Sequence, residues 1–327
     1  GSELPFLLVR LNDWVGAVRE SAATAVSNRV RPDYSKHFFR HLRLVLRLRT
    51  CGRSQHEKIV TAVTDLLQAP EAVSLLREGI RSPDKWLRRE AFRLAVGAKS
   101  AESFELLKEV LSAADPIIRV WAAKDVLSRL KDAELRPLLP RLPHDAFMPV
   151  RREVLNILSQ RALADASGAL REALLDPHSS VRELARYWIR IQQPQFDLVS
   201  VYREALSGGP TARQRAAILG LGETGESADA GAIVPFLKAG HVGLRKAAIR
   251  TLSVLDCAQY VDQFISALID EHPGISSEAA HALAGKAAMM TEQLQSFFGA
   301  ELPKHVRKNV FRLLMNQPVW ARGIFLL

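Results

Sequence analysis

The sequence predicts an all-α fold, an α-solenoid of about ten antiparallel helix pairs, from a repeated motif and its regular spacing. The motif is a hydrophobic residue, then Arg, then a small residue three places after that Arg. We call the Arg place the marked position, and it is occupied by Arg19, Arg88, Arg119, Arg151, Arg182, Arg213, Arg245, Ser276 and Arg307. From Arg88 onward the intervals are 31, 32, 31, 31, 32, 31 and 31 residues. A fixed period in this range indicates a solenoid.

Each period contains the signals for two helices. The run after a marked position carries apolar residues at helical spacing, as in Ile118, Ala122, Val126 and Leu130. Before each run lies a turn rich in Pro, Asp, Gly and His, which ends one helix and caps the next. A shorter apolar helix is expected upstream of each turn. With no alternating strand segments, the period therefore predicts a first helix, a turn and a longer second helix.

The second repeat departs from this spacing. The interval from Arg19 to Arg88 is 69 residues, two repeats plus about seven. We expect a helix over residues 34–49, a turn over 50–54 and a helix over 55–68. No Ser/Gly-rich linker interrupts the chain, so we expect one domain over residues 1–327 with a divergent basic repeat at 31–69.

The repeats resemble HEAT repeats, especially the short variety also found in phycobilisome lyases. The clearest copies are PTARQRAAILGLGETG, from Pro210, and HVGLRKAAIRTL, from His241. The resemblance covers nearly the whole chain. It implies a right-handed solenoid whose second helices line the concave surface, and a marked Arg that bonds the acidic residue of a neighbouring turn.

Composition restricts the class of protein. The net charge is +10, and Arg, which suits phosphate and carboxylate recognition, predominates over Lys. Cys51 and Cys257 are too few for a disulfide framework, and no apolar stretch approaches a membrane span. With no signal peptide, these features lead us to expect a cytoplasmic protein. The apolar end, residues 317–327, has no polar cap, which is compatible with a chain cut from a longer protein.

Positions one and five after the marked position share a helix face and form a row that is basic at both ends and mixed in the middle. On this row, together with the divergent repeat, we expect a partner-binding surface made of Arg40, Arg43, Arg47, Arg89, Arg93, Lys124, Arg152, Tyr187, Lys246, Arg250, Lys308 and Arg312. A solvated helix face remains the alternative. Between Arg29 and Lys58, nine basic residues and two acidic ones surround aromatic side chains, a composition that fits a phosphate backbone or an acidic protein surface.

Asp125 is the one carboxylate in an otherwise largely apolar row, six places after the marked positions, and it shares a face with Trp121. A carboxylate beside an aromatic ring can stabilise a developing cation. Trp121 and Asp125, followed by Arg152, are similar in order to the active-site helix and later Arg of HEAT-like alkylpurine DNA glycosylases. The competing interpretation is structural, with Asp125 paired to Arg129 one turn on or to a marked Arg.

Two other motifs lack the structural context that a dinucleotide site or a metal site requires. Gly220, Gly222 and Gly225 match a dinucleotide-binding pattern, but they end a helix instead of following a strand, so we interpret them as a helix end. His37 and His41 lack the accompanying ligands of a metal site. We therefore expect no metal, no cofactor and no catalytic residue.

The function predicted from the sequence is a non-catalytic scaffold or recognition arm. It binds an acidic macromolecular partner, a protein in our first interpretation, through an extended Arg-rich surface. The alternative is a nucleic-acid-binding protein related to the HEAT-like DNA glycosylases, which would make the chain an N-glycosylase-like enzyme.

Overall fold

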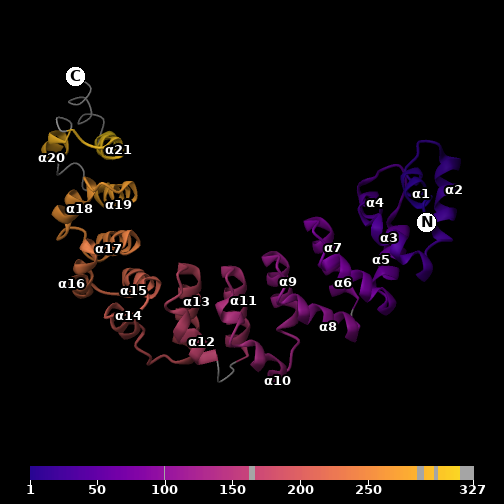
Figure 1. The fold of residues 1–327 in the computed structure, drawn as a ribbon, viewed down its shortest axis with the longest axis horizontal. Coiled ribbons are helices and arrows are strands. Elements are labelled where there is room, and N and C mark those ends of the chain that lie inside the picture. Colours follow the sequence, from indigo (N-terminus) through magenta and orange to yellow (C-terminus); the bar gives the residue numbers. More distant parts are fainter. Residues whose placement is uncertain (99, 162–165, 286–290, 298–300, 317–327) are drawn as a thin grey trace. The chain divides into compact units, whose positions relative to one another are not determined.

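The chain was analysed as a computed structural model, which describes residues 1–98, 100–161, 166–285, 291–297 and 301–316 (Figure 1). The predicted apolar end, residues 317–327, lies outside the described residues. Within these ranges the regular structure is helical, with no strand. No single described helix has the length and hydropathy of a membrane span, and one pair bent by 73°, Glu57–Gln68 with Pro70–Ile80, reaches that criterion only when taken together.

The described helices alternate between shorter first helices and longer second helices, as the period predicts. The first helices are α1 (Leu4–Arg10), α3 (Ser35–Arg40) with α4 (Leu42–Arg47), α6 (Val73–Ile80), α8 (Ala101–Val110), α10 (Asp132–Leu135), α12 (Ala166–Ala173), α14 (Leu198–Leu206), α16 (Ala230–Ile233), α18 (Val261–Leu268) and α20 (Thr291–Ser296). The second helices are α2 (Gly16–Ser27), α5 (Glu57–Gln68), α7 (Lys85–Gly97), α9 (Pro116–Val126), α11 (Met148–Gln160), α13 (Ser179–Gln192), α15 (Thr211–Thr224), α17 (Val242–Leu255), α19 (Pro273–Leu283) and α21 (Lys304–Met315). Ten pairs can be followed in the described ranges, which confirms the all-α solenoid.

Short 3₁₀ helices extend several first helices or turns. They cover Pro32–Tyr34, Leu48–Thr50, Pro70–Ala72, Arg136–Leu138, Leu142–His144, Ser227–Asp229 and Val234–Lys238.

The contacts divide the chain into two compact units, residues 1–157 and 158–327. In the first unit, α2, α5, α7 and α9 pack side by side in order, as do α6 and α8. In the second, α15, α17, α19 and α21 form such a row. Each unit is thus a double layer of first and second helices (Figure 1). The expectation of a single domain over residues 1–327 stays a prediction.

Small residues three places after the marked position make the close packing possible. Ala91, Ala122, Ala185 and Ala248 are fully buried at this place. A short side chain there lets the second helix approach its neighbours closely, and the longer apolar residues on either side fill the remaining space. The motif that set the period is therefore the core of each repeat.

The divergent repeat differs from its prediction in one respect. The helix expected over residues 34–49 is broken at His41, whose ψ of 20° leaves the helical range. Both halves contact α5, and α4 also contacts α1. The buried ring of Phe39, in α3, packs against Gly79 in α6, where even a Cβ would lie 2.4 Å from the ring.

Candidate binding surface

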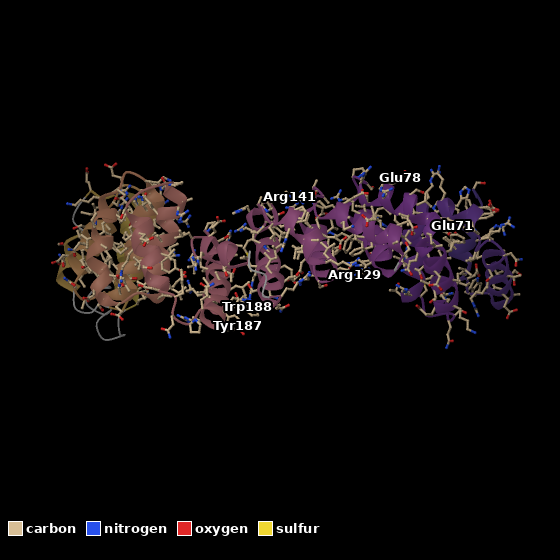
Figure 2. All side chains as sticks on the ribbon, turned by 90° about the horizontal axis from the view of Figure 1, so that it is seen from below. Glu71, Glu78, Arg129, Arg141, Tyr187 and Trp188 are labelled. Carbon is tan, nitrogen blue, oxygen red and sulfur yellow. The ribbon has the colours of Figure 1, made fainter. Side chains whose placement is uncertain are left out.

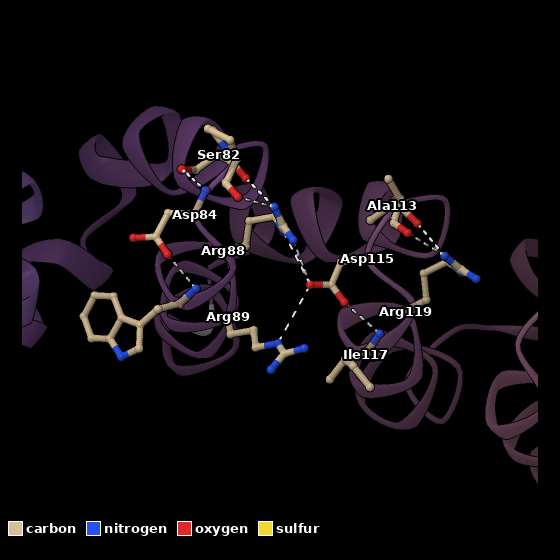
Figure 3. Close-up of polar contacts among 11 residues, drawn as sticks. Ser82, Asp84, Arg88, Arg89, Ala113, Asp115, Ile117 and Arg119 are labelled. Carbon is tan, nitrogen blue, oxygen red and sulfur yellow. Dashed lines mark hydrogen bonds and ion pairs between the residues drawn. The ribbon is translucent and has the colours of Figure 1, made fainter.

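The marked Arg residues form a ladder that joins the turns of successive repeats. Arg88 Nη1 donates to the carbonyls of Ser82 and Pro83 at 2.7 and 3.0 Å, in the turn before its own helix. Its Nη2 and Nε reach Asp115 Oδ2, in the next turn, at 3.2 and 3.4 Å (Figure 3). Asp115 Oδ1 in turn accepts the backbone N–H of Ile117 at 2.9 Å and so caps α9. One guanidinium therefore fixes two turns.

The same arrangement recurs along the chain. An Nη1 donates to the carbonyl six residues earlier at 2.7 to 2.9 Å in Arg19, Arg88, Arg119, Arg151 and Arg182. Arg119 and Arg245 also reach the next turn's carboxylate, Asp145 and Asp270 respectively, at 2.8 Å. These contacts confirm the structural role expected for the ladder.

The ladder changes the acidity of its carboxylates. Burial raises the pKa of Asp115 and of Asp145, but hydrogen bonds from backbone N–H groups and from the ladder guanidinium outweigh it. Both pKa values therefore fall below the usual 3.8. Asp115 and Asp145 therefore favour the ionised form that pairs with the ladder guanidinium groups.

In the first unit, the predicted row places exposed cations on three successive second helices. Arg93, Lys124 and Arg152 project from α7, α9 and α11. The described residues include no acidic partner for Lys124 or Arg152, whereas Arg93 pairs with Glu90 and stacks at 4.8 Å on the ring of Trp121. We call Arg93, Lys124 and Arg152 the basic face.

The other predicted residues of the first unit lie in different surroundings. Arg89 is half-buried, with Nε 3.8 Å from Asp115 Oδ2. Arg43 pairs with Asp84 at 3.2 Å and stacks at 4.8 Å on Trp86, beside the turn before α7. Arg40 and Arg47 are exposed. The divergent repeat is thus tied to the third pair through Arg43, a contact that the row pattern did not reveal.

In the second unit, the predicted row is more mixed. Tyr187 is exposed and meets Trp188 edge-on at 5.3 Å (Figure 2). Arg250 binds Glu278 through two contacts of 2.8 and 2.9 Å. Lys308 is exposed, whereas Arg312 and Lys246 are half-buried. Among the described residues of this unit, no single run of free cations therefore covers the second helices.

A hollow of about 220 Å³ on α15 and α17 reveals a cation that the row missed. Arg215 lines it together with Lys246, Arg250 and Glu278. Arg215 lies two places after its marked position instead of one. The row was restricted to positions one and five, so the sequence pattern did not select Arg215. Its stem lies beside the first turn of α17, 3.6 Å from where a Cβ at Gly243 would be, and Lys246 lies at the same distance from a Cβ at Gly274.

The carboxylate of Asp125 has a structural partner. Arg129 Nη1 lies 2.9 Å from Asp125 Oδ2, one helical turn away, as the structural interpretation expected. Trp121 is covered by Arg93 and packs at 5.9 Å against Phe92. No described hydrogen bond or ion pair joins Arg152 to Asp125, and the glycosylase alternative stays a prediction.

The remaining motifs are accounted for by packing. Gly225 follows the end of α15 as expected, but Gly220 and Gly222 serve close helix contacts, since their Cβ atoms would meet Tyr202 at 2.3 Å and Thr251 at 2.9 Å. Within the described ranges, no group of three or more His, Cys, Asp or Glu side chains is placed to hold a metal ion.

Comparisons with known proteins give structural neighbours only. No family model and no curated protein matches the sequence. Human deoxyhypusine hydroxylase is 20% identical (TM-score 0.31), covering 79% of this chain and 98% of that one. The CpcE–CpcF phycocyanin lyase complex from Nostoc is 20% identical (TM-score 0.33; 68% and 92% covered), and Kap95p, solved with RanGDP, is 10% identical (TM-score 0.43; 96% and 55% covered).

The assignment of the chain therefore rests on its own repeat. Paired helices recur every 31 or 32 residues, a small buried residue lies at the same place in the second helices, and a guanidinium links one turn to the next. These are the features on which the sequence resemblance was based, and they make the chain an α-solenoid of tandem helix pairs that resemble HEAT repeats.

Proposed function

We propose that the chain is a non-catalytic scaffold that binds an acidic protein partner through the basic face of its first unit. The observation that carries the proposal is the placement of Arg93, Lys124 and Arg152 on successive second helices, with the last two free of acidic partners among the described residues. Three exposed cations on successive second helices attract carboxylates electrostatically.

The carboxylates beside these cations favour a protein partner over a nucleic acid. Glu90 pairs with Arg93, and Asp125 and Arg129 lie on the helix that carries Lys124. A phosphate backbone would meet these acidic groups at every step, whereas a protein surface can present basic and acidic groups in a matching pattern. The face of Trp121 is also occupied by Arg93, so it is not open for stacking on a base.

The proposal is tested with the charge-reversal variant Arg93→Glu/Lys124→Glu/Arg152→Glu. The control variant, Lys36→Glu/Lys131→Glu/Arg136→Glu, makes the same change in net charge at exposed positions of the same unit. Partners captured by wild type and by the control, but not by the first variant, would be purified and their dissociation constants measured. We expect a loss of at least about tenfold in affinity, because three charge pairs become repulsive.

Two results would contradict the proposal. One is equal binding of the purified partner by both variants. The other is tight binding of DNA or RNA by the wild type, steeply weakened by salt and abolished by the charge reversal at the basic face. The second result would establish the nucleic-acid alternative.

A further inference from the structure

A hollow of about 790 Å³ lies in the first unit between the turn before α7 and the turn before α9. Its apolar lining includes Leu106, Val110 and Ile118, and its polar lining comes from the ends of α6 and α8 and the starts of α7 and α9. The volume falls within the range of small-molecule sites, about 300–1,000 Å³. It is therefore large enough for a charged group together with a short flanking segment.

The charges around this hollow are strongly unbalanced. Five cations line it, and two carboxylates, Glu109 and Asp115, accompany them. The five are Arg77, Arg81, Lys85, Arg88 and Arg89. The local net charge is therefore +3, concentrated around one opening.

Glu109 is shared between two of these cations. Arg77 and Arg81 lie 2.9 and 3.5 Å from its two carboxylate oxygens. All three side chains are at least 39% exposed, so the pairing is weak and readily exchanged for another anion. Lys85 is exposed, and the described part of the chain supplies no acidic partner for it.

Arg89 adds a donor that lacks an acceptor. Its Nε–H is buried, and no acceptor in the described chain lies within hydrogen-bonding distance of it. Asp115 Oδ2 is 3.8 Å away, too far for a hydrogen bond, because that oxygen is held by Arg88 (Figure 3). A buried guanidinium N–H without an acceptor is unfavourable. A ligand oxygen that accepted a hydrogen bond from Arg89 Nε would therefore be stabilised at this site.

We propose that this hollow binds a phosphate monoester dianion. Such a group offers three strongly accepting oxygens, and planar guanidinium groups bind it through two points. It would neutralise most of the +3 charge, supply the acceptor for Arg89, and displace Glu109 from Arg81. The basic face shares no residue with this hollow, so the proposal stands or falls independently of the proposed function.

The test uses titration calorimetry at low ionic strength with three probes. They are a phosphoserine peptide flanked by Gly and Ala, the same peptide unphosphorylated, and inorganic phosphate. We expect binding of the phosphopeptide or of inorganic phosphate, and none of the unphosphorylated peptide. Tighter binding of the phosphopeptide assigns the site to a modified protein segment, whereas equal binding assigns it to the free anion. Failure of both phosphate probes to bind would overturn the proposal.

Two variants move the affinity in opposite directions. Arg81→Ser/Lys85→Ser removes two exposed cations and is expected to weaken binding at least about tenfold, since hydrogen bonds to charged groups are the strong ones. Glu109→Gln removes the competing carboxylate and is expected to tighten binding about threefold. The matched control, Lys36→Ser/Arg136→Ser, removes the same charge elsewhere on the unit and is expected to bind as the wild type does. Equal losses in the pocket variant and in this control would show general charge attraction and overturn the site.

Discussion

The guanidinium of Arg119 and the carboxylate of Asp145 meet at two points, with Nε 2.9 Å from Oδ2 and Nη2 2.8 Å from Oδ1. The same Arg donates to the carbonyls of Ala113 and Ala114, and the same Asp accepts the backbone N–H of Phe147. Two side chains thus join two turns and the start of a helix. Residues as far apart in sequence as Ala113 and Phe147 are held together by this one contact.

Substitution Asp145→Asn is expected to lower the free energy of unfolding by about 2–3 kcal/mol, because it leaves a largely desolvated guanidinium without its countercharge. The Arg119 and Asp145 side chains are only 14% and 12% exposed. Urea unfolding followed by circular dichroism measures the loss. The control is Asp125→Asn, whose partner Arg129 is 42% exposed and for which we expect less than about 0.5 kcal/mol. Equal losses in the two variants would contradict a special role for the ladder.

The ladder also predicts how stability depends on pH. The pKa values of Asp115 and Asp145 are lowered in the folded protein, burial being outweighed by backbone and guanidinium hydrogen bonds. The folded state then binds fewer protons than the unfolded state, so this stabilisation is complete above the unfolded pKa, about 3.9, and is lost as pH falls through the folded pKa values. Unfolding free energies measured from pH 5 downward should decline, and Asp145→Asn should decline less steeply than wild type. A slope unchanged by the substitution would contradict this assignment.

The period located the marked Arg residues and the resemblance implied the ladder, but neither identified all of its partners. Asp115 and Asp145 follow their Arg by 27 and 26 residues, in the next turn, as the resemblance to HEAT repeats implied. The corresponding turn after Arg182 contains Gly208 and Gly209 and offers no carboxylate. Arg182 binds Glu223 instead, 41 residues away at the end of α15. A substitute so distant cannot be found from a repeat.

The binding surface was less predictable than the fold. Helical spacing placed Arg93, Lys124 and Arg152 on the predicted row, and all three side chains are exposed, but their role in binding stays a prediction. It could not show that Arg93 stacks on Trp121 or that Arg43 reaches Asp84, because these contacts depend on side-chain torsions and on the bend at His41. The hollow with Lys85 and Arg89 likewise arises from two turns that only the packed structure brings together.

Glu223, the distant partner of Arg182, is expected to contribute strongly to the stability of the second unit. Glu223 accepts from Arg182, which is 1% exposed, and from Arg186 Nη1 at 2.6 Å. Glu223→Gln would leave two buried guanidinium groups without a countercharge, and we expect a loss of about 3–5 kcal/mol in unfolding free energy. Glu204→Gln, at an exposed position of the preceding helix, is the control and should change it by less than about 0.5 kcal/mol. A loss below 1 kcal/mol at Glu223, roughly that of a surface pair, would show that the cluster is solvated.

Two Gly→Ala substitutions are expected to change the free energy of unfolding in opposite directions, because α14 packs closely on α15 at one glycine and the other is open. A Cβ at Gly220 would lie 2.3 to 2.6 Å from the ring of Tyr202, which is fully buried and cannot move aside. We expect Gly220→Ala to destabilise the protein by about 1–3 kcal/mol through overpacking, despite the better helix propensity of Ala. At Gly231, in α16, a Cβ meets nothing within 4 Å, so Gly231→Ala should stabilise by about 0.4–1 kcal/mol. Thermal and urea unfolding of both variants measure the two effects. Equal stability of Gly220→Ala and Gly231→Ala would contradict this prediction. It would show that the close approach of Tyr202 to Gly220 does not contribute to the free energy of unfolding.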